Sequence, residues 1–190
     1  WRLDRSVAGA EVIERADSWF GGLDLGYTLV VRPGLAEDAD LAEAAAAAGL
    51  SQMTDSPEMA ICAPVEDVPL PDGVTLRWVA EERDLADFQT ISEAAYGTLG
   101  MPSGVAKTAM RDLDRITDPH VHAVVASREG DPLAAALIVL SHGIAGMYWV
   151  GPVPEARGLG LGDAVARAVA SRAFARGALA CTLPASAQGA

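Results

Sequence analysis

The chain has 190 residues, 51% of them hydrophobic, and carries a formal net charge of −12. A chain of this length can bury one sizeable core, or one domain with an attached subdomain. The acidic balance argues against a nucleic-acid partner, because Lys and Arg side chains that neutralise phosphates supply most of that affinity. No apolar run approaches the roughly 20 positions that a membrane span needs. We therefore predict a soluble, cytoplasmic protein with no membrane partner.

Cysteine and histidine usage argues against metal or disulfide chemistry. The two cysteines, Cys62 and Cys181, lie far apart in the sequence and are read as thiols in a reducing compartment. His120 and His122 are two positions apart, and no Cys/His cluster has metal-ligand spacing. The sequence thus predicts no metal site. It begins at Trp1 and stops at Ala190 directly after a predicted strand, which indicates a fragment of a longer chain.

The first part of the chain, residues 1–70, is predicted to be an N-terminal α/β extension. Residues 1–20 show no sustained hydrophobic period. Further on, β-branched and aromatic residues indicate strands, and an acidic first turn followed by alanines indicates a helix. The expected elements are a strand at 27–32, a helix at 37–48 and a short strand at 58–63. Three prolines make residues 64–73 a linker, since they exclude both helix and central strand.

The second part, residues 74–190, has a different element order. The predicted strands are 74–79, 122–127, 133–140, 147–153 and 179–183. The predicted helices are 82–96, 105–116 and 160–177. Three consecutive strands joined by tight turns must be antiparallel, whereas the final strand–helix–strand unit should be parallel and right-handed. The predicted fold class is therefore α/β (α+β), with a mixed, mostly antiparallel sheet flanked by helices.

One glycine-rich loop carries the chemical signal. It lies between the strand 147–153 and the long helix 160–177, so backbone N–H groups converge at a helix N-terminus, where they favour a pyrophosphate. Its residues are Arg157, Gly158, Leu159, Gly160, Leu161 and Gly162. A Walker A loop is excluded, because Lys107 is the only lysine in the sequence. A dinucleotide fold would need GxGxxG in an early unit and an acid about 20 residues later, and neither is present. The remaining phosphate motif is the Arg/Gln-x-x-Gly-x-Gly/Ala loop that binds CoA.

With this loop and element order, residues 74–190 resemble the GNAT superfamily of acyl-CoA N-acyltransferases. The resemblance implies acetyl-CoA as co-substrate, with its pyrophosphate at the loop. It also implies that strand 147–153 splays from strand 179–183 and that pantetheine bonds to the main chain of Gly151, Pro152 and Val153. A backbone N–H near Val153 would then polarise the thioester carbonyl. Ser186 follows the last strand, where the family often carries Asn or Ser against the pantetheine.

Some features depart from the family pattern. Leu159 stands where many relatives have Lys or Arg, and Asp163 brings a negative charge into the first turn of the helix. The family's usual acid, a tyrosine on the next helix, would lie beyond Ala190, as would the last two strands. The catalytic residues are therefore unknown from the sequence. Tyr148, Glu155 and Glu82 are candidate bases without a spacing argument, and Tyr96 and Met101 fall where the family shapes its acceptor pocket.

Two functions remain open at this stage. The first is an N-acetyltransferase that moves an acetyl group from acetyl-CoA to a primary amine of a small molecule or peptide, by direct attack in a ternary complex. The second is a non-catalytic acyl-CoA-binding or regulatory module. The sequence identifies neither the acyl acceptor nor the oligomeric state, for which a homodimer is one candidate. Residues 1–63 are read either as the tail of a degenerate, truncated copy of the same fold or as an unrelated extension.

Overall fold

A computed structural model describes residues 6–53 and 55–185 of the chain. By internal contacts the chain divides into two compact units, Trp1–Asp55 and Ser56–Ala190. The strand at residues 58–63, expected with the N-terminal extension, is found in the second unit as β1, Glu58–Ile61. It belongs to this unit because it pairs with β6, the last strand in the chain. Within the described residues, no helix is long and apolar enough to cross a membrane.

The N-terminal unit is built on two helices that approach closely. They are α1, Gly9–Gly21, and α2, Ala39–Ala47, the latter preceded by the short 3-10 helix η1, Ala36–Asp38. A Cβ at Gly9 would lie 2.6 Å from the carbonyl oxygen of Asp40, so only glycine fits at this contact. The Gly9 N–H donates to the Asp40 carboxylate at 2.8 Å. Helix α1 was not predicted, because few of its large apolar residues are buried, and Trp19 is 70% exposed.

The strand predicted at residues 27–32 is wrong. These residues form no strand, and their polar groups are bonded locally. The Arg32 N–H and guanidinium bind the Asp38 carboxylate at 2.7 to 3.0 Å. The Tyr27 hydroxyl donates to Asp17, and its ring stacks on Phe20. These side-chain contacts, and not a strand ladder, fix the segment.

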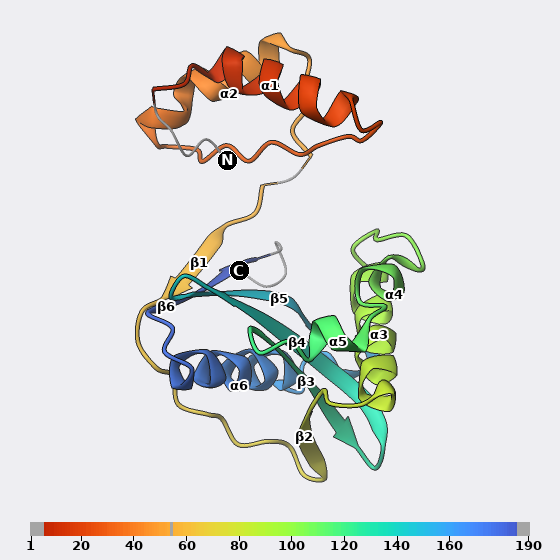
Figure 1. Ribbon diagram of the computed structural model, residues 1–190. Helices are drawn as coiled ribbons and strands as arrows, with labels where there is room; N and C mark the ends of the chain where they lie inside the picture. The colour runs from red at the N-terminus through yellow and green to blue at the C-terminus, as the bar shows by residue number, and fades with distance from the viewer. Residues whose placement is uncertain (1–5, 54, 186–190) are drawn as a thin grey trace. The chain divides into compact units, whose positions relative to one another are not determined.

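The second unit contains a six-stranded sheet in the order β1-β6-β5-β4-β3-β2 (Figure 1). All neighbouring strands are antiparallel except β5 and β6, which are parallel, as predicted for the strand–helix–strand unit. The strands after β1 are β2 Val74–Trp78, β3 Val121–Arg128, β4 Asp131–Ser141, β5 Ile144–Pro152 and β6 Ala180–Pro184. The predicted fold class is confirmed, and β1 provides an antiparallel partner for β6.

Helices cover both faces of this sheet (Figure 1). They are α3 Glu82–Gly97, α4 Val105–Ala109, α5 Leu113–Ile116 and α6 Leu161–Ala175. Successive side chains of a strand point to opposite faces. Thus Val124 and Ala126 of β3 join the core under α6, while Ala123 and Val125 join the core under α3. Both faces are buried, which explains the nearly continuous apolar runs of β3 and β4.

The helix predicted at 105–116 is interrupted. It is divided into α4 and α5 at Met110, which has φ −118° and ψ 42°. The Gln89 side chain of α3 donates to the Met110 carbonyl oxygen at 2.7 Å, and the Met110 side chain is buried. A tertiary hydrogen bond therefore takes a carbonyl that a continuous helix would have used, and the periodicity of the segment could not reveal this.

Candidate functional site

Strand β5 contains a bulge at Trp149 and Val150. Ala135 of β4 pairs with Gly151 and Leu137 pairs with Tyr148, so two residues of β5 lie opposite the single residue between them on β4. Trp149 has φ 55°, a left-handed conformation that is uncommon for a bulky residue. Bulges concentrate next to functional sites, because they redirect side chains and free backbone groups from the ladder. The bulge therefore makes this half of β5 a candidate for a functional site.

Beyond the first residues of β5, strands β5 and β6 separate. They pair only through Ile144–Ala180, Ala145–Cys181 and Gly146–Thr182. From Met147 onward, β5 has no partner on this side among the described residues, although it continues to pair with β4. The separation agrees with the splay expected from the resemblance. It leaves one edge of β5 open to an extended ligand.

At the end of β5, one backbone N–H that was expected to face the ligand is bonded within the sheet. Gly151 and Pro152 pair with Ala135 and Ala134 of β4. The Val153 N–H donates to the Leu133 carbonyl oxygen at 2.8 Å, so it is already used by the sheet. Pro152 has no N–H. The Val153 N–H is therefore engaged within the sheet, whereas the resemblance implied that an N–H near Val153 faces a thioester carbonyl.

The glycine-rich loop leads directly into α6. Gly158 and Gly160 both have φ 76°, a region in which a side chain is strained. Gly160 is the N-cap of α6 and offers no capping side chain. The backbone N–H groups of residues 158–163 have no hydrogen-bond acceptor within the described part of the chain. Leu161 is 1% exposed and anchors the first turn in the core, so these donors are held in place around a site suited to an anion.

Arg157 connects this loop to α3. Its Nη2 donates to Thr98 Oγ1 at 2.5 Å and approaches the Ala95 carbonyl oxygen at 3.5 Å. A cation near the C-terminal end of a helix interacts favourably with the helix dipole. The expected charge at the loop is present, and it is held by the C-terminal end of α3.

The acid in the first turn of α6 is paired. Both Asp163 carboxylate oxygens accept from Arg167 Nε at 2.9 Å, one helical turn later. Arg167 Nη1 also donates to the Glu66 carbonyl oxygen at 3.0 Å, within the linker before β2. The pair offsets the negative charge that Asp163 brings close to the loop.

Tyr96, at the end of α3, reaches the β5 bulge. Its ring lies 5.0 Å from the Trp149 ring at an interplanar angle of 58°. Burial raises the pKa of Tyr96, while hydrogen bonds from the backbone N–H groups of Val150 and Trp149 act to lower it. One turn earlier on α3, Ser92 is 1% exposed, and its Oγ has no partner among the described atoms. The sequence placed Tyr96 near the acceptor pocket but contained no signal for its contact with the bulge.

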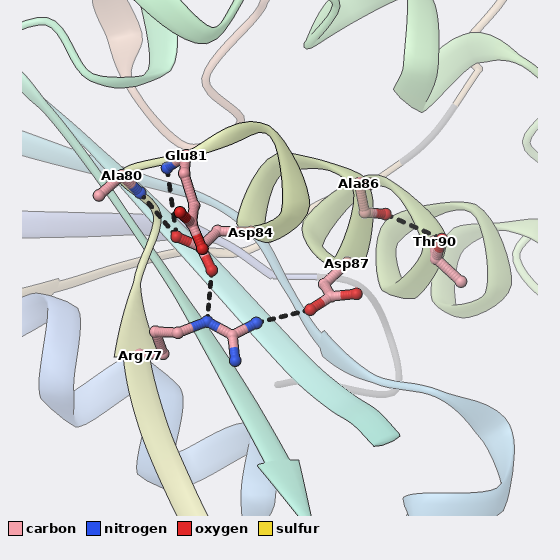
Figure 2. Close-up of polar contacts among 7 residues, drawn as sticks. All are labelled: Arg77, Ala80, Glu81, Asp84, Ala86, Asp87 and Thr90. Carbon is pink, nitrogen blue, oxygen red and sulfur yellow. Dashed lines mark hydrogen bonds and ion pairs between the residues drawn. The ribbon is translucent and has the colours of Figure 1, made fainter. Parts of the chain in front are cut away.

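A polar network holds the start of α3. Figure 2 shows the Arg77 guanidinium between Asp84 and Asp87; it binds Asp84 through Nε and Asp87 through Nη2 at 2.5 Å. The Ala80 and Glu81 N–H groups donate to Asp84 at 3.0 and 3.2 Å, closing a capping box. Burial would raise the pKa of Asp84, but these hydrogen bonds outweigh it and lower the pKa below 3.8. The network joins the start of α3, the helix that carries Tyr96, to β2.

The other candidates are dispersed. The Tyr148 side chain is 45% exposed, and its hydroxyl lies over Gly146, an earlier residue of β5. Glu82 and Glu155 are exposed, and Ser186 lies outside the described residues. An open hollow of about 710 Å³ lies along α1 of the N-terminal unit, but it is lined by none of the residues expected at the site. No group of three or more His, Cys, Asp or Glu in the described ranges could hold a metal ion.

Comparisons with known proteins bear on the fold. Neither the protein-family models nor the curated proteins give a match. Among solved structures, a GCN5-related N-acetyltransferase from Kribbella flavida is 22% identical over 93% of this chain and 66% of its own, with a TM-score of 0.68. A GCN5-related N-acetyltransferase from Sphaerobacter thermophilus is 19% identical over 80% of this chain and 48% of its own, with a TM-score of 0.64.

A third match is a GNAT family acetyltransferase from Brucella melitensis in complex with acetyl-CoA, 21% identical over 60% of this chain and 76% of its own, with a TM-score of 0.50. This chain thus spans 66% of the Kribbella structure and 48% of the Sphaerobacter structure. At these identities the likeness concerns the arrangement of elements. The chain has the fold of the GNAT superfamily of acyl-CoA N-acyltransferases.

Proposed function

We propose that this chain is an acetyl-CoA-dependent N-acetyltransferase that transfers the acetyl group to a primary amine. The observation that supports this most directly is the loop before α6. It presents the backbone N–H groups of residues 158–163 without acceptors within the described chain, in a fold shared with acetyltransferases. A diphosphate supplies the negative oxygens that such a set of donors lacks.

The path of the rest of the co-substrate follows from the separation of β5 and β6. An extended pantetheine arm with amide groups can lie along the unpaired edge of β5 beyond Gly146, as an added strand would. The residues proposed to bind acetyl-CoA are Gly151, Pro152, Val153, Arg157, Gly158, Leu159, Gly160, Leu161 and Gly162. The thioester would then lie close to the bulge, where an amine could attack it directly in a ternary complex.

Thermal unfolding with added nucleotides tests the binding half of this proposal. A ligand that binds only the folded state stabilises it by about 2.7 kcal/mol at a hundred times its dissociation constant. Acetyl-CoA should therefore raise the melting temperature, whereas NAD and ATP should leave it unchanged. A shift with NAD or ATP but none with millimolar acetyl-CoA would contradict the assignment.

Release of free CoA distinguishes the enzyme from a non-catalytic acyl-CoA-binding module. Both bind acetyl-CoA, but only the enzyme produces a free thiol faster when a primary amine is present. A thiol-reactive dye, with acetyl-CoA and a panel of polyamines, amino acids and peptide N-termini, gives this reading. Binding without thiol release from any amine would support the regulatory module.

A further inference from the structure

We propose that Glu93 is a positioning residue of this site. It fixes residues 98–104, the segment between α3 and α4, beside the β5 bulge, and this segment forms part of the surface that binds the amine. The inference rests on the proposed function and adds to it the surface that the acceptor contacts. Glu93 lies on α3, one turn before that helix ends at Gly97.

The Glu93 carboxylate caps a helix to which it does not belong. Its Oε2 accepts from the Gly104 N–H at 2.8 Å, and its Oε1 accepts from the N–H groups of Ala106 at 2.8 Å and Lys107 at 3.3 Å. Gly104 is the N-cap of α4, has φ 86° and provides no side-chain cap. A helix of five residues is too short to be stable by itself, so the start of α4 depends on the carboxylate from α3.

The other end of the segment is fixed by α3 and by the loop before α6. The Met101 N–H donates to the Tyr96 carbonyl oxygen at 3.1 Å. Thr98 Oγ1 accepts from the Arg157 guanidinium. Residues 98–104 are therefore tied down at both ends, and loss of the α4 cap should release one of them.

The segment lies beside the part of β5 proposed to hold the thioester. The Met101 side chain packs against the core under α3, and so does Trp149, the bulge residue. The Tyr96 ring, just before the segment, lies 5.0 Å from the Trp149 ring at an interplanar angle of 58°. The segment and the bulge thus share one apolar cluster, on the face of the sheet opposite α6.

These positions leave one approach for the amine. The loop before α6 is assigned to the diphosphate, the unpaired edge of β5 to the pantetheine arm, and the other edge of β5 is paired with β4. An amine that attacks the thioester therefore reaches the bulge from the α3 face, past residues 98–104. Leu99 in this segment is 46% exposed, so it offers an apolar surface to the body of the amine.

Glu93 acts through the backbone and not on the substrate. Its two oxygens already accept three N–H groups, so the carboxylate is not placed to take a proton from the amine. The hydrogen bond from Gly104, with those from Lys107 and Ala106, lowers the pKa of Glu93 against the opposing effect of burial. The cap therefore stays ionised at neutral pH. A change at Glu93 should affect how the amine binds and leave the chemical step unchanged.

The test uses the full natural protein with acetyl-CoA and the amine that gives the fastest thiol release in the panel above. Glu93→Gln keeps the size of the side chain, but its NH₂ group cannot accept a hydrogen bond. Loss of binding that the ground and transition states share raises KM and leaves kcat unchanged. We expect KM for the amine to rise roughly 10- to 100-fold, with kcat and the dissociation constant for acetyl-CoA nearly unchanged.

Two controls separate this role from a loss of stability. Asp84 accepts two N–H groups at the other end of the same helix, so Asp84→Asn should also lower the melting temperature but leave KM for the amine unchanged. Leu99→Ala changes an exposed side chain of the segment itself, and KM should change by a factor of a few. Leu179→Ala, at a leucine that is 76% exposed, should not change it.

The outcomes distinguish this inference from the proposed function. If the natural protein releases no thiol with any amine, the proposed function fails and the role of Glu93 fails with it. If it turns over while Glu93→Gln keeps the same KM for the amine, only the Glu93 assignment is overturned. An equal rise of KM in Asp84→Asn also overturns it, as does a loss confined to kcat or to acetyl-CoA affinity. Should Glu93→Gln not fold, an unchanged KM in Leu99→Ala overturns the assignment.

Discussion

Arg157 Nη2 donates to Thr98 Oγ1 at 2.5 Å, and this bond joins the loop before α6 to the C-terminal end of α3. It places a cation beside the proposed pyrophosphate loop and, at the same time, holds the helix end that carries Tyr96. The two proposed halves of the site, one for the diphosphate and one for the acyl group, are thus physically connected through a single guanidinium.

Removal of that guanidinium should weaken acetyl-CoA binding. Because a charge-assisted hydrogen bond contributes about 1.5–3 kcal/mol, Arg157→Ala should raise the dissociation constant roughly 10- to 100-fold. The matched variant Thr98→Val breaks the same contact but keeps the charge, so its affinity should equal that of the natural protein or exceed it. Calorimetry at two salt concentrations measures both. An equal loss in the two variants would mean that the contact with α3, and not the charge, supports binding.

A side chain at Gly160 should abolish acetyl-CoA binding. With φ 76° and no atom within 4 Å of an added Cβ, the methyl group of Gly160→Ala meets no protein atom, and we expect it to take up space that the diphosphate needs. The left-handed backbone costs about 1–2 kcal/mol for a residue with a Cβ, and Gly160→Val should behave similarly while remaining folded.

Gly130 provides the control for this variant. It lies in the turn between β3 and β4 with φ 94° and is equally open, so Gly130→Ala should lower the melting temperature by a similar amount. Only Gly160→Ala should lose acetyl-CoA binding by calorimetry. If both variants bind normally, the loop is a turn without a ligand.

The Asp163–Arg167 pair should tune affinity for the diphosphate. Arg167→Ala leaves the Asp163 carboxylate uncompensated near the loop, and repulsion should weaken acetyl-CoA binding by a factor of a few. Asp163→Asn should strengthen it. Both effects should shrink as salt is raised, because exposed charges are screened. Titrations at low and high ionic strength provide the measurement, and affinities insensitive to both variants would place the diphosphate elsewhere.

The Arg77–Asp84 contact should make stability depend on pH in acid. Because the folded pKa of Asp84 is lowered below 3.8, its contribution is fully present above about pH 4 and is lost as pH falls through the folded pKa. At pH 7, Asp84→Asn should lower the free energy of unfolding by about 1.5–3 kcal/mol. Urea unfolding should show this difference shrinking toward pH 3. Asp87→Asn, at a more exposed carboxylate, should cost under about 1 kcal/mol.

The sequence by itself determined the order of elements in the second unit and the position of the loop. Both are written in local patterns: strand-length apolar runs, helical spacing in α3, and glycines at 158, 160 and 162 between a strand and a helix. Glycine at these positions permits positive φ, and the first N–H groups of any helix lack partners, so the proposed anion site follows from neighbouring residues alone.

Only the tertiary structure decided the rest of the site. The bulge at Trp149, the use of the Val153 N–H by β4 and the contact of Tyr96 with β5 each depend on residues distant in sequence. The same is true of β1, which pairs with β6 although the linker and most of the unit separate them. Burial and strand register, which set these contacts, arise from packing across the whole sheet, and no local pattern records them.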